Sequence, residues 1–270
     1  MDTPISSSAN PLVKRIRRLG ERKHRRREGA FYVEGIQPVW QAVEAGAEIE
    51  TLVVAPDLLT SVDARRMVEA VERRGVRAVR VTRGVFASLS DRDNPVGLAA
   101  VIRARAARLD DLRVTAASCF VALHEIGNPG NLGTILRTAE AAGATGVLLL
   151  GDTTDPYHPT AVKASMGALF TTPTVHVPEP GDFFAWAEAR GVGVVTTSAH
   201  ARDEHWSVRY TRPLALLLGS EGEGLPPELL ARGDLAVRIP MTGTADSLNL
   251  AVAAGILLYE VRRQLRDEDD

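Results

Sequence analysis

The chain has 270 residues, of which 45% are apolar and 24% charged, and its formal net charge is −2. These values are typical of a soluble globular protein that is large enough for one large domain or two smaller ones. No apolar run reaches the ~18 residues of a membrane span, and residues 1–30 lack the apolar core of a signal peptide, so we expect a cytoplasmic protein with no membrane partner.

Basic residues are concentrated near the start of the chain. Residues 1–105 hold 19 Lys and Arg against 13 Asp and Glu, a difference of +6, whereas residues 106–270 hold 13 against 21, a difference of −8. So dense a cluster repels itself unless an anion neutralises it, which favours a polyanion as its partner. A solvated helix without a partner and a membrane surface are the alternatives. The nine cations of the cluster are Lys14, Arg15, Arg17, Arg18, Arg22, Lys23, Arg25, Arg26 and Arg27.

The first part of the chain predicts a small α/β/α unit, which we assign to residues 1–105. Asn10 and Pro11 are typical of the start of a helix. No catalytic arrangement is visible in this unit, and residues 106–117 are expected to form a linker. We expect helices at residues 11–27, 35–45, 62–74 and 85–89, and strands at residues 31–33, 51–55, 77–82 and 97–103.

Residues 118–270 predict a second α/β domain with a mostly parallel sheet, whose ligands bind at the carboxyl ends of the strands. We expect strands at residues 119–123, 146–150, 174–177, 192–197, 213–218 and 235–239, and helices at residues 134–142, 159–165, 182–190, 227–231 and 247–265. Three segments rich in Gly, Asn and Ser follow strands in this domain. We call them motif 1 (residues 127–138), motif 2 (216–226) and motif 3 (239–255).

Motif 1 places three glycines and two asparagines at the junction of a strand and a helix. Glycine lets the backbone bend sharply, and asparagine keeps a polar group exposed. Arg137, expected one turn into the helix, adds a permanent cation. On its own, this pattern also fits an ordinary tight loop with a surface arginine.

Motif 2 is a glycine-rich loop that carries Glu221 and Glu223 after an apolar strand. The two carboxylates would repel a phosphate, and the Lys-Ser/Thr pair of a P-loop is missing. The loop therefore suits a cationic ligand or one with hydroxyl and amine donors. The spacing of its glycines is not that of a dinucleotide fingerprint, which argues against a dehydrogenase.

Motif 3 contains Ser247, a candidate helix cap, and Asn249 in the first turn of an otherwise apolar helix. A buried amide needs partners, so we expect Asn249 to form a hydrogen bond with a neighbouring loop. The small residues at positions 251 and 253–255 would allow close approach of another helix, for example from a second subunit.

Together, the three motifs resemble the SpoU (TrmH) family of RNA ribose 2′-O-methyltransferases, in the SPOUT class. The order and spacing agree over residues 119–260, and the arrangement is closest to the large-subunit ribosomal RNA methyltransferases of the family. Residues 31–35 look like part of an L30e-like RNA-binding domain, and residues 163–170 like a family segment near the substrate. The matching positions are Asn128, Gly130, Asn131, Gly133 and Arg137 in motif 1, Leu216, Gly219, Glu221 and Gly224 in motif 2, and Ile239, Pro240, Met241, Ser247, Leu248, Asn249 and Ala253 in motif 3.

The resemblance implies an enzyme that transfers a methyl group from S-adenosylmethionine to a ribose 2′-hydroxyl of structured RNA, with ribosomal RNA favoured. It also implies a deep trefoil knot in residues 118–270, an L30e-like substrate-binding domain in residues 1–105, and a homodimer packed partly through the last helix. No metal is implied. A transfer RNA methyltransferase and a non-catalytic RNA-binding or assembly protein with the same fold are the alternatives.

The resemblance also implies roles for particular residues. Arg137 acts as a base or, because guanidinium pKa values lie above about 12, as a clamp for the adjacent phosphate that stabilises the developing alkoxide. Asn131 and Asn249 hold the loops and the ribose, Glu221 shapes the site, and Ser247 is a further functional position. Cofactor contacts are implied for Leu218, Gly219, Glu221, Ile239, Met241, Ser247 and Leu248. From charge, and apart from the resemblance, we expect RNA contacts at the nine cations of the basic cluster and at Lys163, the only lysine after residue 23.

Other candidate sites are weaker. The segment His200–His205 matches no zinc signature and is expected to be a solvated turn. Ser165 and Ser220 lack the Gly-x-Ser-x-Gly context of a serine hydrolase. Cys119, the only cysteine, lies in an apolar strand, so we expect a buried thiol in a reducing compartment.

Overall fold

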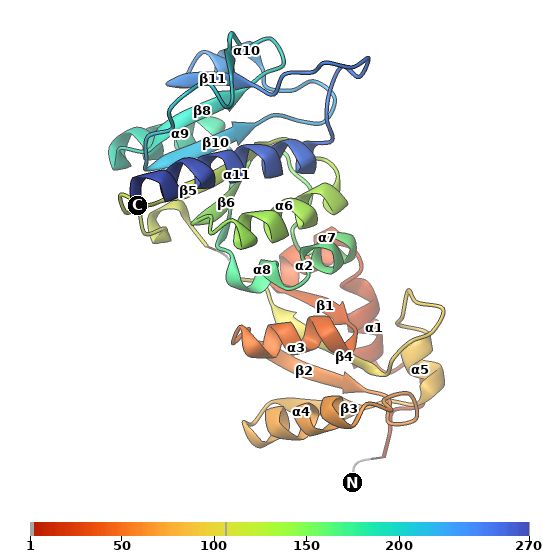
Figure 1. Ribbon diagram of the computed structural model, residues 1–270. Coiled ribbons are helices and arrows are strands. Elements are labelled where there is room, and N and C mark those ends of the chain that lie inside the picture. The colour runs from red at the N-terminus through yellow and green to blue at the C-terminus, as the bar shows by residue number, and fades with distance from the viewer. Residues whose placement is uncertain (1–2, 106, 270) are drawn as a thin grey trace. The chain divides into compact units, whose positions relative to one another are not determined.

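A computed structural model describes residues 3–105 and 107–269 of the chain. The chain divides into two compact units, Met1–Arg105 with Tyr157–Phe170, and Ala106–Pro156 with Thr171–Asp270. The prediction of an α/β protein is confirmed in both units (Figure 1). None of the helices in the described ranges combines the length and the apolar character needed to cross a bilayer.

The first unit is built on a four-stranded sheet in the order β1-β4-β2-β3. Strand β4 is antiparallel to both of its neighbours, and β2 is parallel to β3. Apolar side chains of α1 and α5 pack against one face of this sheet. The elements are α1 (Pro11–Arg18), α2 (Arg22–Glu28), β1 (Ala30–Glu34), α3 (Ile36–Glu44), β2 (Ile49–Val54), α4 (Val62–Arg73), β3 (Arg77–Arg80), α5 (Arg83–Ala87) and β4 (Leu98–Arg103), followed later by α7 (Pro159–Ser165) and α8 (Ala168–Thr171).

The chain returns to the first unit at Tyr157–Phe170, a segment that we assigned to the second domain from the sequence. Aromatic packing explains this placement, because the ring of Phe31 lies 4.5 Å from that of Tyr157 and 6.3 Å from that of Phe170. The Gln41 amide also donates a 2.6 Å hydrogen bond to the Met166 carbonyl.

The second unit contains a seven-stranded sheet in the order β7-β6-β5-β10-β8-β11-β9, and all of its strand pairs are parallel. Every residue of β5, β6 and β10 is buried, as expected for a parallel sheet covered on both faces. Its elements are η1 (Leu109–Asp111), β5 (Cys119–His124), α6 (Pro129–Ala141), β6 (Gly146–Leu150), β7 (Thr174–Val177), α9 (Pro180–Arg190), β8 (Gly193–Thr197), β9 (Asp203–Glu204), β10 (Leu214–Leu218), α10 (Pro227–Leu230), β11 (Leu235–Arg238) and α11 (Leu250–Asp269) (Figure 1).

Three predicted helices are interrupted or begin at least three residues from the expected start. The helix expected at residues 11–27 is interrupted between Arg18 and Arg22. The helix expected from residue 134 begins at Pro129, because Asn128 caps it. The last helix begins at Leu250 rather than Ser247, so the prediction that Ser247 caps it is wrong.

Candidate functional site

The three motifs lie at one edge of the seven-stranded sheet. Motif 1 follows β5, motif 2 begins within β10 and leaves its carboxyl end, and motif 3 follows β11. Strands β5 and β10 are neighbours, and only β8 separates β10 from β11. Because all of these strands run in the same direction, their carboxyl ends bring the motifs together, as the sequence predicts.

Asn128 sets the start of α6 in motif 1. Its side-chain oxygen accepts hydrogen bonds from the backbone N–H groups of Gly130, at 2.8 Å, and Asn131, at 3.1 Å. Pro129 occupies the first helical position, where the missing N–H costs nothing. Asn131 therefore projects from the first turn of a helix and not from a flexible loop.

A chain of hydrogen bonds joins one residue from each motif. The Asn131 side-chain N–H donates to Glu221 Oε1 at 3.1 Å, and the Asn249 side-chain N–H donates to Asn131 Oδ1 at 3.0 Å. Asn249 Oδ1 in turn accepts the N–H of Ala251, at 2.9 Å, and caps α11. A carboxylate can only accept, so this sequence of bonds permits one orientation for each amide.

Glu221 is the anionic end of this network. It also accepts, at 3.4 Å each, the backbone N–H groups of Gly127 and Asn128. Burial by itself would raise the pKa of Glu221, but the bonds from the Asn131 amide and from the backbone N–H groups outweigh it and lower that pKa. The carboxyl group is therefore ionised near neutral pH and holds motif 1 against motif 2.

Motif 2 forms a tight loop in which Gly219 cannot be replaced without moving the backbone. A Cβ at this position would lie 2.0 Å from the Gly224 carbonyl carbon. The backbones of Ser220 and Gly224 are paired through two 3.2 Å hydrogen bonds, and Gly224 has a φ of 71°. Glycine at positions 219 and 224 therefore fixes the shape of the loop.

Motif 3 places Asn249 as expected in one respect only. Asn249 does bond to a neighbouring segment, Asn131, but it is exposed and not buried. The helix that approaches α11 closely at Gly255 is α6 of the same chain. A Cβ at Gly255 would lie 3.5 Å from the Thr138 methyl group of α6.

A cavity of about 430 Å³ opens between motifs 2 and 3. The seven residues for which the sequence implied cofactor contacts all line it: Leu218, Gly219, Glu221, Ile239, Met241, Ser247 and Leu248. The segment Thr197–His200 also lines it and was not predicted, although its position directly after β8, at the same edge of the sheet, was a usable signal.

Arg137 does not line this cavity. It is exposed on α6, and within residues 3–105 and 107–264 no side chain or backbone group pairs with its guanidinium. A substrate anion can therefore reach it.

The basic cluster of α1 and α2 divides into exposed and structural members. Arg25 is 3% exposed, and its guanidinium donates to the Leu19 and Gly20 carbonyls at 2.8 and 2.7 Å, which places it outside any RNA-binding surface. Arg15 is bound to Glu28, at 2.7 Å, and to Glu50, at 2.8 Å. Burial opposes its charge, but these hydrogen bonds and the two carboxylate charges raise the pKa of Arg15. The exposed cations are Lys14, Arg17, Arg18, Arg22, Lys23, Arg26, Arg27 and, on α7, Lys163.

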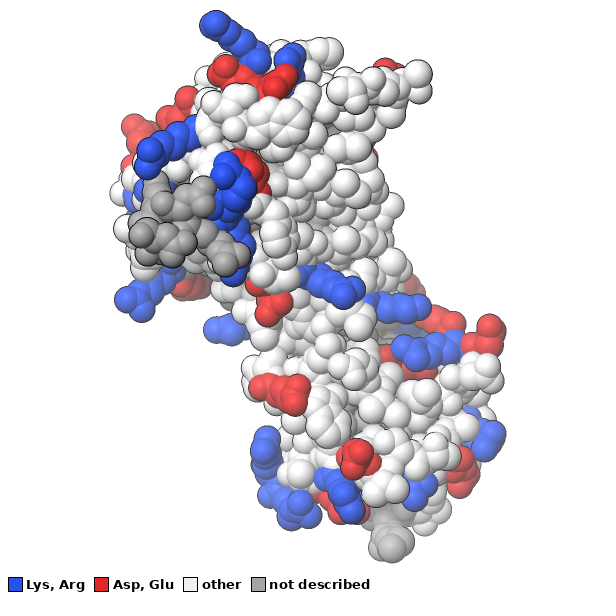
Figure 2. All heavy atoms as spheres, viewed as in Figure 1, with Lys and Arg blue, Asp and Glu red and all other residues white. Residues whose placement is uncertain are grey.

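Acidic side chains are interspersed with basic ones over the face drawn in Figure 2. In the part of the chain that the structure describes, no group of three His, Cys, Asp or Glu side chains is placed to hold a metal ion.

Asp203 and Glu204, expected in a turn, form the short strand β9 beside β11. Cys119 is buried as predicted, and burial raises the pKa of its thiol to about 11.

Comparisons with known proteins match both parts of the chain. The model of the SpoU rRNA Methylase family matches residues 118–259, and that of the MRM3-like substrate binding domain matches residues 10–100. A 23S rRNA (uridine(2479)-2′-O)-methyltransferase of Streptomyces viridochromogenes is 35% identical over 91% of this chain and 87% of its own length. The 23S rRNA (guanosine(2553)-2′-O)-methyltransferase RlmP of Bacillus subtilis is 29% identical over 96% and 98%.

Solved structures are similar over nearly the whole chain. The AdoMet-bound rRNA methyltransferase of Sinorhizobium meliloti has a TM-score of 0.89 and 38% identity, and the match covers 97% of this chain and 98% of that one. The SpoU methyltransferase AviRb of Streptomyces viridochromogenes, in complex with AdoMet, has a TM-score of 0.88 and 34% identity over 95% and 98%. The family match spans more than half of the chain, and the chain belongs to the SpoU rRNA methylase family.

Proposed function

We propose that this protein transfers a methyl group from S-adenosylmethionine to a ribose 2′-hydroxyl of ribosomal RNA. The observation that carries the proposal is the bonded series Glu221–Asn131–Asn249, which ties all three family motifs together beside one cavity. The names of the two relatives reported above, each of which matches most of both chains, favour ribosomal RNA as the substrate.

The residues around the cavity fit S-adenosylmethionine. Leu225, Leu230, Leu250 and Leu257 give it apolar walls that suit an adenine ring. Glu221, Glu223 and Asp246 line the same cavity and suit a ligand that carries a sulfonium and an ammonium group. Gly219 lets the backbone of motif 2 close on itself at Gly224 beside the cavity, where a side chain would force the two apart. When bound, the cofactor supplies a methyl group activated by positively charged sulfur.

The chain must position and activate a weak nucleophile, the ribose hydroxyl. The amides of Asn131 and Asn249 are exposed enough to meet the ribose, and Glu221 holds them in place through the bonds described above. We assign Asn131 and Asn249 to positioning the ribose, and Glu221 and Ser247 to shaping the site.

Arg137 is assigned to the adjacent phosphate and to the negative charge that develops on the ribose oxygen. It is exposed and has no partner in the described part of the chain, so an incoming phosphate is free to bind it. A clamp needs no deprotonation of a guanidinium group, which is costly. We therefore favour stabilisation of the alkoxide over general-base catalysis.

The enzyme acts as a homodimer in this proposal. Leu248, two residues before α11, is 37% exposed, and Val252 and Tyr259 on α11 are 51% and 52% exposed. The spacing of these three residues forms an apolar stripe. A second copy that covers this stripe would bring a partner surface to α6, which packs beside α11 and carries Arg137. The SPOUT trefoil knot in the second unit, the L30e-like character of the first, and action in the cytoplasm belong to the same proposal.

Two measurements test the proposed function. Calorimetry with S-adenosylmethionine should show binding at one site per chain, and Gly219→Ala, which forces the backbone of the loop to move, should abolish it. Transfer of labelled methyl groups to ribosomal RNA should fall by about 100-fold or more in Arg137→Ala, since loss of one group that stabilises a developing anion costs about that much. Binding of S-adenosylmethionine without methyl transfer would favour a non-catalytic RNA-binding protein. If Arg137→Ala transferred methyl groups as fast as the wild type, Arg137 would have no catalytic role.

A further inference from the structure

We propose that a groove between α3 and α4 binds an unpaired nucleotide of the RNA substrate, with the base against Trp40 and adjoining phosphates on Arg73 and Arg74. The proposal rests on the methyltransferase function proposed above. It adds a contact in the first unit to which none of the three motifs contributes.

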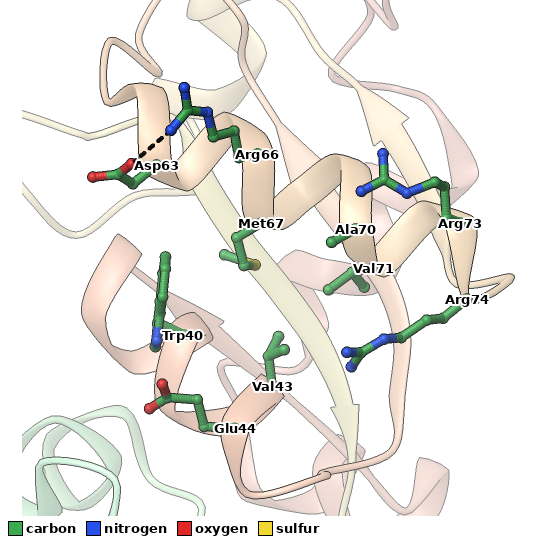
Figure 3. A pocket seen from close by; sticks show the side chains of 10 residues that line it. All are labelled: Trp40, Val43, Glu44, Asp63, Arg66, Met67, Ala70, Val71, Arg73 and Arg74. Atoms are coloured by element: carbon green, nitrogen blue, oxygen red, sulfur yellow. Dashed lines mark ion pairs between the residues drawn. The ribbon is translucent and has the colours of Figure 1, made fainter.

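The groove has a volume of about 450 Å³ and is lined entirely by side chains of α3, α4 and the residue after it (Figure 3). This volume lies within the range of sites that hold small organic groups. Met67 and Val71, which are 8% and 3% exposed, form its floor together with Val43. The floor is therefore apolar, and it belongs to the packed contact between two helices.

Trp40 gives this floor a flat wall. Its side chain is partly buried, and Figure 3 shows it at one end of the groove beside Met67. An indole that faces an apolar surface is suited to stack on a planar base, and such stacking tolerates any base because each has a π-face.

Two cations without partners lie at the other end. Arg73 and Arg74 are exposed, and neither forms a hydrogen bond or ion pair with the described part of the chain. Arg66, by contrast, faces Asp63 at 3.7 Å. Figure 3 shows Arg74 extending from the end of α4 toward Val43. Long cationic side chains at the mouth of an apolar groove complement a ligand that joins a planar apolar face to phosphates, which is the chemistry of RNA.

Glu44 is an acidic residue of the groove that forms no ion pair with the described part of the chain. It lies one helical turn from Trp40 on the same face of α3, and both line the groove. A carboxylate accepts hydrogen bonds from the exocyclic amino group of cytosine, whereas uracil carries a repelling carbonyl oxygen at that position and offers only its ring N3–H as a donor. The groove should therefore prefer cytosine to uracil.

Tryptophan emission can report on this groove directly. Trp206 is 56% exposed and Trp186 is 6% exposed, so Trp206→Phe leaves Trp40 as the more exposed of the two remaining tryptophans. In that background, a dodecacytidylate RNA should quench the emission, and a dodecauridylate RNA should quench it at several-fold higher concentration. This readout is needed because the exposed cations of α1 and α2 are also expected to bind RNA.

Variants then test the residues separately. By anisotropy of the labelled oligonucleotide, Trp40→Ala should raise the Kd about 5- to 100-fold, and Trp40→Phe should restore most of the loss. Arg74→Gln should reduce the slope of log K against log salt by about 0.7. Arg83→Gln, an equal loss of charge outside the groove, should not change the quenching of Trp40.

The outcomes separate this proposal from the proposed function. An absence of quenching, or an unchanged KM for ribosomal RNA in Trp40→Ala and Arg74→Gln while the wild type methylates normally, would overturn the groove assignment. Quenching by a glutamate-rich peptide but not by RNA would overturn it too and would assign the groove to acidic peptides. Quenching by RNA in a protein that transfers no methyl group would leave the groove standing and count against the proposed function.

Discussion

Asn131 is the residue on which the geometry of the site depends most. Its amide donates to Glu221 and accepts from Asn249, so it uses both of its polar ends to join motif 2 to motif 3. Its own position is set by the Asn128 cap at the start of α6. The identity of this residue was predictable from the motif, whereas its two bonds depend on how three strands far apart in the sequence are ordered in the sheet.

Truncation of Asn131 should therefore impair catalysis more than folding. Asn131→Ala removes two partly exposed hydrogen bonds, which costs about 1 kcal/mol of unfolding free energy, and frees the two loops to move. We expect methyl transfer to fall by at least about tenfold. Glu140→Ala, a truncation of an exposed residue on the same helix, is the matched control and should retain activity. Equal activity of the two variants would contradict the role given to Asn131.

The ionised Glu221 should make stability depend on acid pH. Its pKa is lower in the folded chain than its ordinary value of 4.5, so its stabilising contribution is complete above about pH 4.5 and disappears as the pH falls through the lowered value. Denaturant unfolding at several pH values should show wild type more stable than Glu221→Gln at pH 7, with a gap that closes below pH 4.5. If the stability difference between the two proteins grew as the pH fell, the pKa of Glu221 would not be lowered by folding.

At the level of elements, the basic segment predicted as one helix over residues 11–27 forms two helices, α1 and α2. Residues 11–27 have helical periodicity, but Gly20 lies between α1 and α2, and the buried Arg25 binds the carbonyls of Leu19 and Gly20. The periodicity of apolar residues could not predict this break. Periodicity does not show that the Arg25 side chain turns back to bind the carbonyls that follow α1. By contrast, the bounds predicted for β6, α7 and β7 match those observed, since apolar runs and Pro159 mark them locally.

Arg25 and Arg26, adjacent in sequence, should respond differently to truncation. Arg25→Ala leaves two carbonyls without a charged donor in a buried place, so we expect a loss of about 2–4 kcal/mol in unfolding free energy. Arg26 is exposed, and Arg26→Ala should change stability by less than about 0.5 kcal/mol while weakening RNA binding and its salt dependence. Denaturant unfolding and RNA titration distinguish the two. The reverse pattern would contradict the division of the basic cluster.

At the scale of the whole molecule, the sequence predicted the parallel sheet and the edge where the motifs meet. It did not predict that Tyr157–Phe170 would join the first unit, because that placement depends on contacts with Phe31 and Gln41, more than a hundred residues earlier. It also did not predict that Gly255 of α11 would face α6, while Val252 and Tyr259 remain exposed.

The proposed dimer can be tested on that apolar stripe. Sedimentation should show the wild type as a dimer and the double variant Val252→Glu, Tyr259→Glu as a folded monomer, since two charges on the stripe cannot be buried without partners. Val62→Glu, at a position of the first unit that is 60% exposed, should remain dimeric. A monomeric wild type, or a double variant that still dimerises, would exclude this surface.

The most direct measurement concerns the chemical position of the transferred methyl group. Ribosomal RNA should be incubated with the wild-type protein and methyl-labelled S-adenosylmethionine, and then hydrolysed in alkali, which cleaves RNA only after a free 2′-hydroxyl. We predict that the label appears in alkali-resistant dinucleotides and that Arg137→Ala places almost none there. Label in the mononucleotides released by alkali, which indicates base methylation, or an absence of label with the wild type would contradict ribose 2′-O-methylation.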